Sequence, residues 1–167
     1  MRHGNGTCTF AVDGSKFVGV WANNVPYKGT LSLMDGTMLD GDWNDEIYSG
    51  TGVIRFGNGD VYQGEWKQNM PHRYGKMAYR NGRVYSGEWS SGQRNGNGMM
   101  EYPNGDVYEG TWKKDNRDGY GVLRYQRGDV YEGEWKDDMM HGKGMLKHYD
   151  GKVVEGLWVQ GLKADNQ

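Results

Sequence analysis

Apolar and polar side chains alternate with a period of two over short stretches of this chain, and glycines stand among the apolar positions. In residues 119–135, Tyr131, Gly133 and Trp135 fall on one side of an extended chain, and the glutamates between them fall on the other. A second alternating run precedes this one, and three residues ending in Gly128 join the two. This arrangement predicts a β-hairpin with one aromatic face, one charged face and a left-handed glycine in its turn.

The hairpin pattern recurs along the chain. Successive tryptophans are separated once by 22 residues and afterwards by 23 residues, and a glycine stands two residues before each. The tryptophans are Trp21, Trp43, Trp66, Trp89, Trp112, Trp135 and Trp158. A fixed period of this length is typical of one supersecondary unit copied in tandem, in which each copy contacts mainly its neighbours.

We therefore predict an all-β fold: an elongated single-file array of about seven 23-residue β-hairpin repeats that forms a twisted rod or trough. The array is predicted to be one domain over residues 1–167, with units centred on the tryptophans. It begins in the middle of a unit, as a fragment of a longer array would. The polar segments 67–73, 90–95, 113–118 and 136–141 are predicted to link the hairpins. No segment shows the sustained 3.6-residue periodicity of a helix.

Composition narrows the classes of function. Glycine occurs 29 times and aromatic residues make up 13% of the chain, which favours a thin structure that buries rings. The formal net charge of −2 argues against nucleic-acid binding through phosphate neutralisation. One cysteine, Cys8, excludes an internal disulfide and fits a reducing, cytoplasmic compartment. No apolar run approaches the roughly 20 residues of a transmembrane helix.

Three motifs carry a family resemblance: Tyr108-Glu109-Gly110-Thr111-Trp112, Tyr131-Glu132-Gly133-Glu134-Trp135 and His141-Gly142-Lys143-Gly144. With the period of 23, they resemble the MORN (membrane occupation and recognition nexus) repeat, and the chain is similar to the repeat array of protozoan cytoskeletal MORN proteins. It departs from the pattern where Phe17, Leu39 and Val154 replace the tyrosine. The resemblance implies an all-β hairpin array, a scaffold or adaptor role between cytoskeleton and membrane, phospholipid affinity and self-association.

Candidate chemistry is sparse. The carboxylates before tryptophan (Glu65, Glu88, Glu134 and Asp42) recur once per unit, so we interpret them as a solvated strand face rather than as acid–base pairs. The Gly-x-Gly segments lack a following helix N-terminus and are interpreted as hairpin entries rather than phosphate-binding loops. The histidines lack metal-ligand spacing, although a site shared between two chains stays open. We expect no catalytic residue, no cofactor and no metal within the chain.

The aromatic face has two interpretations. Its rings either form the core between repeats or line a groove that binds an extended peptide or a helix. The candidate groove residues are Tyr62, Trp66, Tyr85, Trp89, Tyr108, Trp112, Tyr131 and Trp135.

Basic residues in the predicted linkers suggest a lipid contact. Lys67, Arg73, Lys113, Lys114 and Arg117 are the candidate ligands for a phosphoinositide headgroup. Acidic residues are interleaved among them, whereas a polybasic membrane site needs about four to eight cations close together. Solvated loop tips are therefore the alternative interpretation.

The C-terminal unit is unusual because both faces of its last strand are apolar. A capping repeat should be more polar on its outer side, and an uncapped strand is a template for another chain. We predict a tail-to-tail homodimer with two-fold symmetry. Its interface residues are Val153, Val154, Leu157, Trp158, Val159 and Leu162. The alternative is that Leu162 and the tail fold back as a lid.

The sequence thus predicts a non-enzymatic structural scaffold of the cytoskeleton that self-associates through its C-terminal repeat and binds cytoskeletal proteins along the aromatic groove. Two alternatives remain at this point. One is a phosphoinositide-binding module that positions a cytoskeletal assembly at the membrane periphery. The other is an accessory repeat region of an enzyme whose catalytic domain lies outside this chain.

Overall fold

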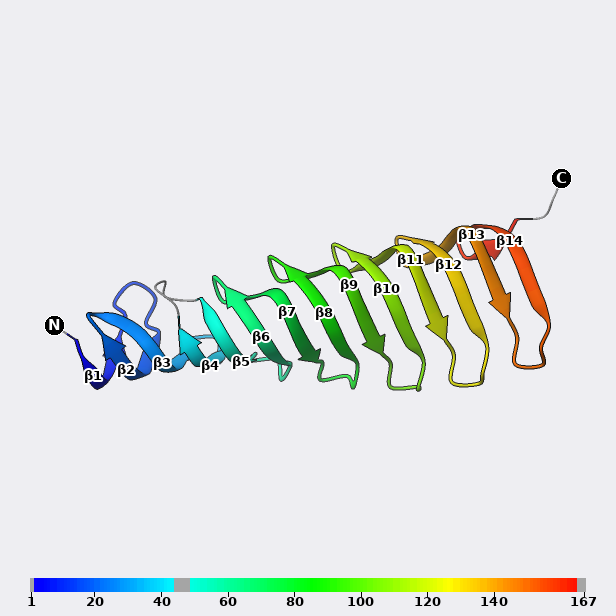
Figure 1. The fold of residues 1–167 in the computed structure, drawn as a ribbon. Helices are drawn as coiled ribbons and strands as arrows, with labels where there is room; N and C mark the ends of the chain where they lie inside the picture. Colours follow the sequence, from blue (N-terminus) through cyan, green and yellow to red (C-terminus); the bar gives the residue numbers. More distant parts are fainter. Residues whose placement is uncertain (1, 44–48, 165–167) are drawn as a thin grey trace. The chain divides into compact units, whose positions relative to one another are not determined.

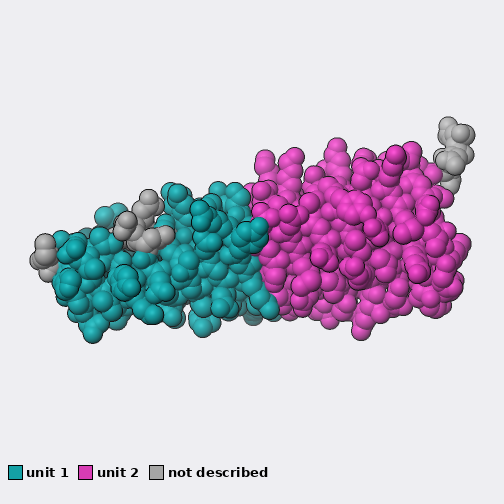
Figure 2. All heavy atoms as spheres, viewed as in Figure 1, with its two compact units in different colours: residues 1–80, 89–92 teal, residues 81–88, 93–167 magenta. Residues whose placement is uncertain are grey.

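The computed structural model describes residues 2–43 and 49–164, and these residues form β-strands and turns without a helix. The predicted all-β hairpin array is confirmed. The chain divides into two compact units (Figure 2). Unit 1 comprises Met1–Arg80 and Trp89–Gly92, and unit 2 comprises Asn81–Glu88 and Gln93–Gln167. The single domain over residues 1–167 stays a prediction.

Both units are antiparallel sheets in which each strand pairs with the next strand along the chain (Figure 1). Unit 1 contains β1 (Gly4–Thr9), β2 (Lys16–Ala22), β3 (Val25–Ser32), β4 (Met38–Trp43), β5 (Gly50–Arg55), β6 (Val61–Lys67) and β7 (Met70–Ala78). Strand β8 (Val84–Ser90) begins in unit 2 and ends in unit 1. Unit 2 continues with β9 (Gln93–Glu101), β10 (Val107–Lys113), β11 (Asn116–Arg124), β12 (Val130–Lys136), β13 (Met139–Lys147), β14 (Val153–Val159) and β15 (Leu162–Lys163).

Glycine closes every predicted hairpin turn in the left-handed conformation, as the sequence predicts. In the turn between β11 and β12, Gly128 has a φ of 102° and its amide donates to the carbonyl of Tyr125. A residue with a Cβ would be strained there. The corresponding glycines are Gly14, Gly36, Gly59, Gly82, Gly105 and Gly151.

The predicted polar linkers do not form separate segments. Most of their residues belong to the strands, which are joined by tight two-residue turns. Between β10 and β11, only Lys114 and Asp115 are outside the strands, and both have positive φ (48° and 71°). Two consecutive left-handed residues are the mark of the hairpin turn that matches the twist of its strands. Consequently β11 begins at Asn116, three residues before the glycine at which the sequence predicted the hairpin entry.

In β11 and β13 the Gly-x-Gly segments lie within the strands, at β-bulges, and not at the hairpin entries. The register between β12 and β13 shifts after Gly133, and Gly142 sits in the shifted segment with a φ of 59°. Gly119 has the same role in β11 with a φ of 98°. A bulge bends its strand and increases the local twist, so β11 and β13 each carry a bend two residues before their central glycine.

Candidate functional site

The inner face of each sheet is a continuous aromatic core. Each repeat tyrosine lies over a cross-strand pair of glycines: a Cβ on Gly144 would meet the Tyr131 ring, because the bare backbone provides the space for it. Neighbouring rings meet edge to face, with centroids 5.1 to 5.6 Å apart. This is the preferred geometry of aromatic pairs. The core therefore runs from repeat to repeat within a unit.

The eight predicted groove residues all belong to this core. Tyr62, Tyr85, Tyr108 and Tyr131 are 0% exposed, and Trp66, Trp89, Trp112 and Trp135 are between 2% and 5% exposed. The interpretation as core between repeats accounts for this burial. The rings offer no free surface to a partner, and partner binding at these residues stays a prediction.

In unit 2, polar atoms of the aromatic core are paired with the backbone. The Tyr131 hydroxyl donates to the carbonyl of Glu134 at 3.1 Å, and the Trp135 indole donates to the carbonyl of Gly121 at 3.2 Å. Burial raises the pKa of Tyr131 to about 12 and also raises the pKa of Tyr62 and Tyr108. The tyrosines are therefore neutral donors at physiological pH, with a structural role.

Two arginines of unit 2 each cover a tryptophan ring, Arg94 that of Trp112 and Arg117 that of Trp135. The Arg117 guanidinium lies 4.1 Å from the Trp135 ring centroid, and its Nε donates to an Asp138 carboxylate oxygen at 3.0 Å. Arg94 has the same contacts with Trp112 and Asp115. The Arg117 side chain is only 17% exposed. Cation–π and ion-pair contacts therefore hold Arg117 against the core, and its role as a lipid ligand stays a prediction.

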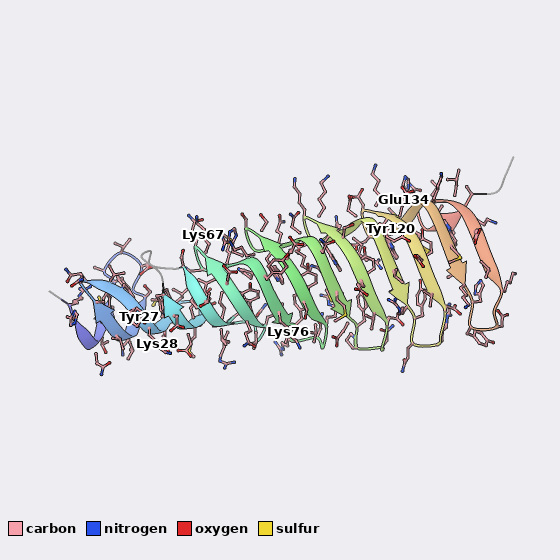
Figure 3. All side chains as sticks on the ribbon, in the orientation of Figure 1. Tyr27, Lys28, Lys67, Lys76, Tyr120 and Glu134 are labelled. Carbon is pink, nitrogen blue, oxygen red and sulfur yellow. The ribbon has the colours of Figure 1, made fainter. Side chains whose placement is uncertain are left out.

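The other predicted lipid ligands are nearer to the solvent. Lys67, Lys113 and Lys114 are exposed at the two-residue turns, and Figure 3 labels Lys67 at the end of β6. Arg73 lies 3.3 Å from the Glu65 carboxylate and occupies a bulge with a φ of 53°. Lys113 and Lys114 are an exposed pair, whereas a polybasic membrane site has about four to eight cations close together. Lipid binding stays a prediction.

Acidic side chains in the hairpin turns link successive repeats, a role that the sequence analysis missed. Asp129 accepts hydrogen bonds from the Tyr149 amide at 2.9 Å, in the next turn along the chain, and from Arg127. The Tyr149 amide and the neighbouring Arg127 lower the pKa of the Asp129 carboxyl. Asp60 and Asp106 accept equivalent bonds from the next turn. The recurrence of Asp after the turn glycine was the available signal.

The glutamates before tryptophan also have a structural role. Glu134 accepts a hydrogen bond from the Lys143 amide at 3.1 Å, and Glu88 accepts one from the Asn97 amide at 2.8 Å. These amides follow the bulge glycines. Thr111 replaces the glutamate in one repeat, and its hydroxyl donates to the carbonyl of Asp118. The interpretation as a purely solvated face is therefore incomplete, because these side chains cap the bulges.

The outer face of unit 2 carries a feature that the sequence analysis did not anticipate. The central glycines pair across consecutive strands, with their side-chain positions towards the aromatic core and only their backbone towards the outer face; they are Gly98, Gly110, Gly121, Gly133, Gly144 and Gly156. Two open hollows lie along these glycines, with volumes of about 820 Å³ and about 670 Å³. Tyr120 lines both hollows and is 56% exposed. Its hydroxyl donates to a Glu132 carboxylate oxygen at 2.6 Å, which raises the pKa of Tyr120. Figure 3 labels Tyr120 on β11 and Glu134 on the neighbouring β12.

The C-terminal repeat presents an apolar patch. Val153, Leu157, Val159 and Leu162 are 47%, 56%, 51% and 74% exposed, whereas Trp158 is buried and Val154 is half-buried. Leu162 belongs to the short β15, which folds back on β14, with Val159 opposite Leu162. The tail thus returns as the lid interpretation expected, but the side chain of Leu162 remains in the solvent.

No group of three or more His, Cys, Asp or Glu side chains that could hold a metal ion occurs among residues 2–43 and 49–164. Cys8 is buried, so it does not present a thiol to a second chain. Within the same described segments, no helix is long and apolar enough to cross a membrane.

Comparisons with known proteins assign the family. The chain is similar in structure to the SAS-4 (dCPAP) TCP domain in complex with a Proline Rich Motif of Ana2 (dSTIL) of Drosophila melanogaster. The TM-score is 0.48 at 15% identity, covering 92% of this chain and 77% of that chain. No curated protein matches the sequence. The family model for the MORN repeat matches residues 1–15, 40–61, 62–82, 85–107, 108–130 and 131–153. The chain therefore belongs to the MORN repeat family.

Proposed function

We propose that this MORN array is a non-enzymatic cytoskeletal scaffold that self-associates tail to tail through its C-terminal repeat and carries protein partners. MORN repeats are in general non-catalytic scaffold and adaptor modules, which supports the coarse assignment. The apolar patch of the C-terminal repeat supports the proposed self-association. A cytoplasmic location at the cytoskeleton remains a prediction. The alternative role, as an accessory repeat region of an enzyme whose catalytic domain lies outside this chain, also remains a prediction.

Apolar residues of the patch stand at positions where the interior repeats carry charged residues. One period earlier, Leu157 corresponds to Glu134 and Val159 corresponds to Lys136. The glutamate caps a bulge and the lysine is exposed. Leu157 and Val159 are 56% and 51% exposed in the terminal repeat, and exposed apolar clusters mark interaction sites.

The strand edge next to the patch is also incompletely paired. Strand β14 covers Val153–Val159, but β15 pairs only with Trp158 and Val159, and the Ala164 amide reaches the carbonyl of Leu157. The first half of this edge has no ladder partner in the part of the chain that the structure describes. An open edge beside an apolar patch favours a second copy, because a two-fold contact places the same patch on both sides.

The test is the solution mass by sedimentation or light scattering. We expect a dimer for the unchanged chain and a monomer for the double variant Leu157→Glu with Val159→Glu, since two buried, unpaired carboxylates per chain oppose the contact. Tyr27→Glu is the matched control, because Tyr27 is 60% exposed in unit 1 and lies outside the patch. A double variant that stays dimeric, or an unchanged chain that is monomeric, contradicts the proposal.

Lipid binding is the second candidate function, and the adjacent exposed side chains of Lys113 and Lys114 favour it. Co-sedimentation with vesicles containing phosphoinositide should weaken steeply as salt rises, because the contact rests on charge. Binding that persists at high salt would contradict this mode of recruitment.

A further inference from the structure

We propose that Asn81, in the turn before β8, is a site of spontaneous deamidation, which converts its side-chain amide to a carboxylate and inserts an isoaspartyl link into the main chain. The inference goes beyond the proposed scaffold function and does not depend on self-association. Asparagine is among the thermally labile residues of proteins. An asparagine is followed by glycine at six positions of this chain, and their surroundings differ.

The reaction consumes only water. The Gly82 backbone nitrogen loses its proton and attacks the Asn81 Cγ, so that a C–N bond forms and negative charge develops on Oδ1. The Cγ–Nδ2 bond then breaks, and ammonia leaves with the proton. Water opens the resulting succinimide ring at either carbonyl carbon, which gives aspartate or isoaspartate. Glycine favours the attack because no Cβ shields its nitrogen.

Three of the Asn-Gly pairs lie within strands. Asn5 belongs to β1, and Asn95 and Asn97 belong to β9. Closing the ring requires the main chain to rotate, and backbone held in a hydrogen-bonded ladder must open before it can do so. The Asn97 amide nitrogen also donates to a Glu88 carboxylate oxygen at 3.2 Å. The reactive candidates are therefore the three turn asparagines: Asn58, Asn81 and Asn104.

The three turn asparagines have matched backbones. All three are exposed to water, and the glycines that follow them have φ between 84° and 93°. The residue after the glycine is Asp60 or Asp106 in two of the turns and Arg83 in the third. A difference in reactivity among the three turns therefore reports on the side chain at this position.

A carboxylate holds the amide in two of these turns. Asn104 donates from Nδ2 to an Asp106 carboxylate oxygen at 2.9 Å, and its Oδ1 accepts from the Asp106 amide at 3.2 Å. Asn58 makes the same two hydrogen bonds with Asp60, each at 2.9 Å. The carboxylate retains the leaving nitrogen, and its negative charge opposes the charge that develops on Oδ1. Both asparagines are therefore protected.

Arg83 reverses the charge at Asn81. The Asn81 Oδ1 accepts hydrogen bonds from the Arg83 amide and from the Arg83 Nε, both at 3.2 Å. Donors aimed at an oxygen that becomes negative stabilise the transition state. The arginine also stands in place of the carboxylate that holds the amide nitrogen in the other two turns. Asn81 is therefore the most reactive of the three.

The two products differ in their effect on the turn. Aspartate at position 81 adds a negative charge beside Arg83 and leaves the length of the main chain unchanged. Isoaspartate adds one carbon to the main chain immediately before Gly82, whose left-handed φ of 84° belongs to the turn. The isoaspartyl form should therefore be less stable than the aspartyl form, although the two carry the same charge.

The experiment follows the full chain by peptide mapping and mass spectrometry during incubation at several pH values. We expect Asn81 to convert about fivefold faster than Asn58 or Asn104, the effect of one exposed charge contact on a barrier. The rate should rise with pH, because hydroxide removes the proton from the Gly82 nitrogen. Arg83→Asp, which copies the other two turns, should bring the rate at position 81 within about twofold of theirs. Arg83→Gln should give an intermediate rate.

Unfolding the chain in urea separates structure from local sequence. The three turn sites should then convert within about twofold of one another, because their hydrogen bonds are lost. Equal rates in the folded chain, a difference that persists in urea, or an unchanged rate in both Arg83 variants would overturn the inference. Circular dichroism confirms that each variant is folded.

Asn81→Asp is the matched control for the isoaspartyl form, because it has the charge of the product and an ordinary main chain. The purified isoaspartyl form should melt at a lower temperature than this variant. Equal melting temperatures would contradict the effect on the turn.

Discussion

The interior repeats of unit 2 and its C-terminal repeat differ in one core position. Interior repeats carry Tyr108 or Tyr131, whose ring covers a pair of glycines and whose hydroxyl binds the backbone. The terminal repeat carries Val154, and a Cβ on Gly156 would meet only the Lys163 side chain. The tyrosine thus packs each interior repeat of unit 2 against its neighbour, whereas no ring covers Gly156 in the terminal repeat.

Unit 1 shows the same dependence in its interior. Leu39 occupies the tyrosine position there, and Trp43 meets Trp66 directly at 5.5 Å between ring centroids. The Trp66 indole N–H is buried without a hydrogen-bond partner in the described part of the chain. An unsatisfied buried donor costs about 1–3 kcal/mol, so this junction is a weak point of unit 1.

The largest effect is expected from Trp135→Ala. The Trp135 ring contacts Tyr108, Tyr131 and Arg117, and its loss should lower the free energy of unfolding by about 3–5 kcal/mol. Trp158→Ala should cost less, because the terminal ring meets only Tyr131 among these aromatic contacts. Urea unfolding of both variants measures the difference. Equal losses would show that the terminal repeat is as tightly closed as the interior.

The next largest loss of stability is expected from Gly144→Ala. A Cβ there would stand 2.3 Å from the Tyr131 hydroxyl oxygen, and the required shift should cost about 1–3 kcal/mol. Gly6→Ala is the control, because its Cβ would meet Trp21 at an ordinary 3.6 Å. Melting temperatures report both effects. If the two variants lose the same stability, the ring on the glycine pair is not what closes the repeat.

Tyr131→Phe tests the hydroxyl alone. It removes the bond to the Glu134 carbonyl and leaves the ring in place, so the expected loss is about 1 kcal/mol. The variant should also unfold less readily in alkali, because no phenol remains to ionise. Since the folded pKa of Tyr131 is raised to about 12, its stabilising contribution is complete below the usual pKa near 10 and is lost as the pH rises towards 12. Alkaline unfolding curves check both statements.

The smallest effect is expected at low pH. Asp129 links the terminal hairpin turn to the preceding turn through the Tyr149 amide. Because its folded pKa is lowered, its contribution is present above the ordinary value of 3.8 and is lost as the pH falls through the folded value. Hydrogen exchange at the Tyr149 amide should therefore accelerate in acid before the interior repeats loosen. Asp129→Asn should abolish this pH dependence.

Local features of the fold were predictable from neighbouring residues. The left-handed glycines, such as Gly128, and the assignment of Tyr131 and Trp135 to one face both follow from short-range stereochemistry. The long strands were missed, because two left-handed residues such as Lys114 and Asp115 carry no strong sequence signal. The bulges were missed because Gly119 and Gly142 are also compatible with a hairpin entry.

Sequence alone determined the period, the hairpins and the two faces, because these depend on residues that are close along the chain. Tertiary structure decided which side chains meet across strands. Arg117 contacts Asp138, and Asp129 holds Tyr149, 20 or 21 residues away. Such contacts depend on strand register and on the bulges that shift it.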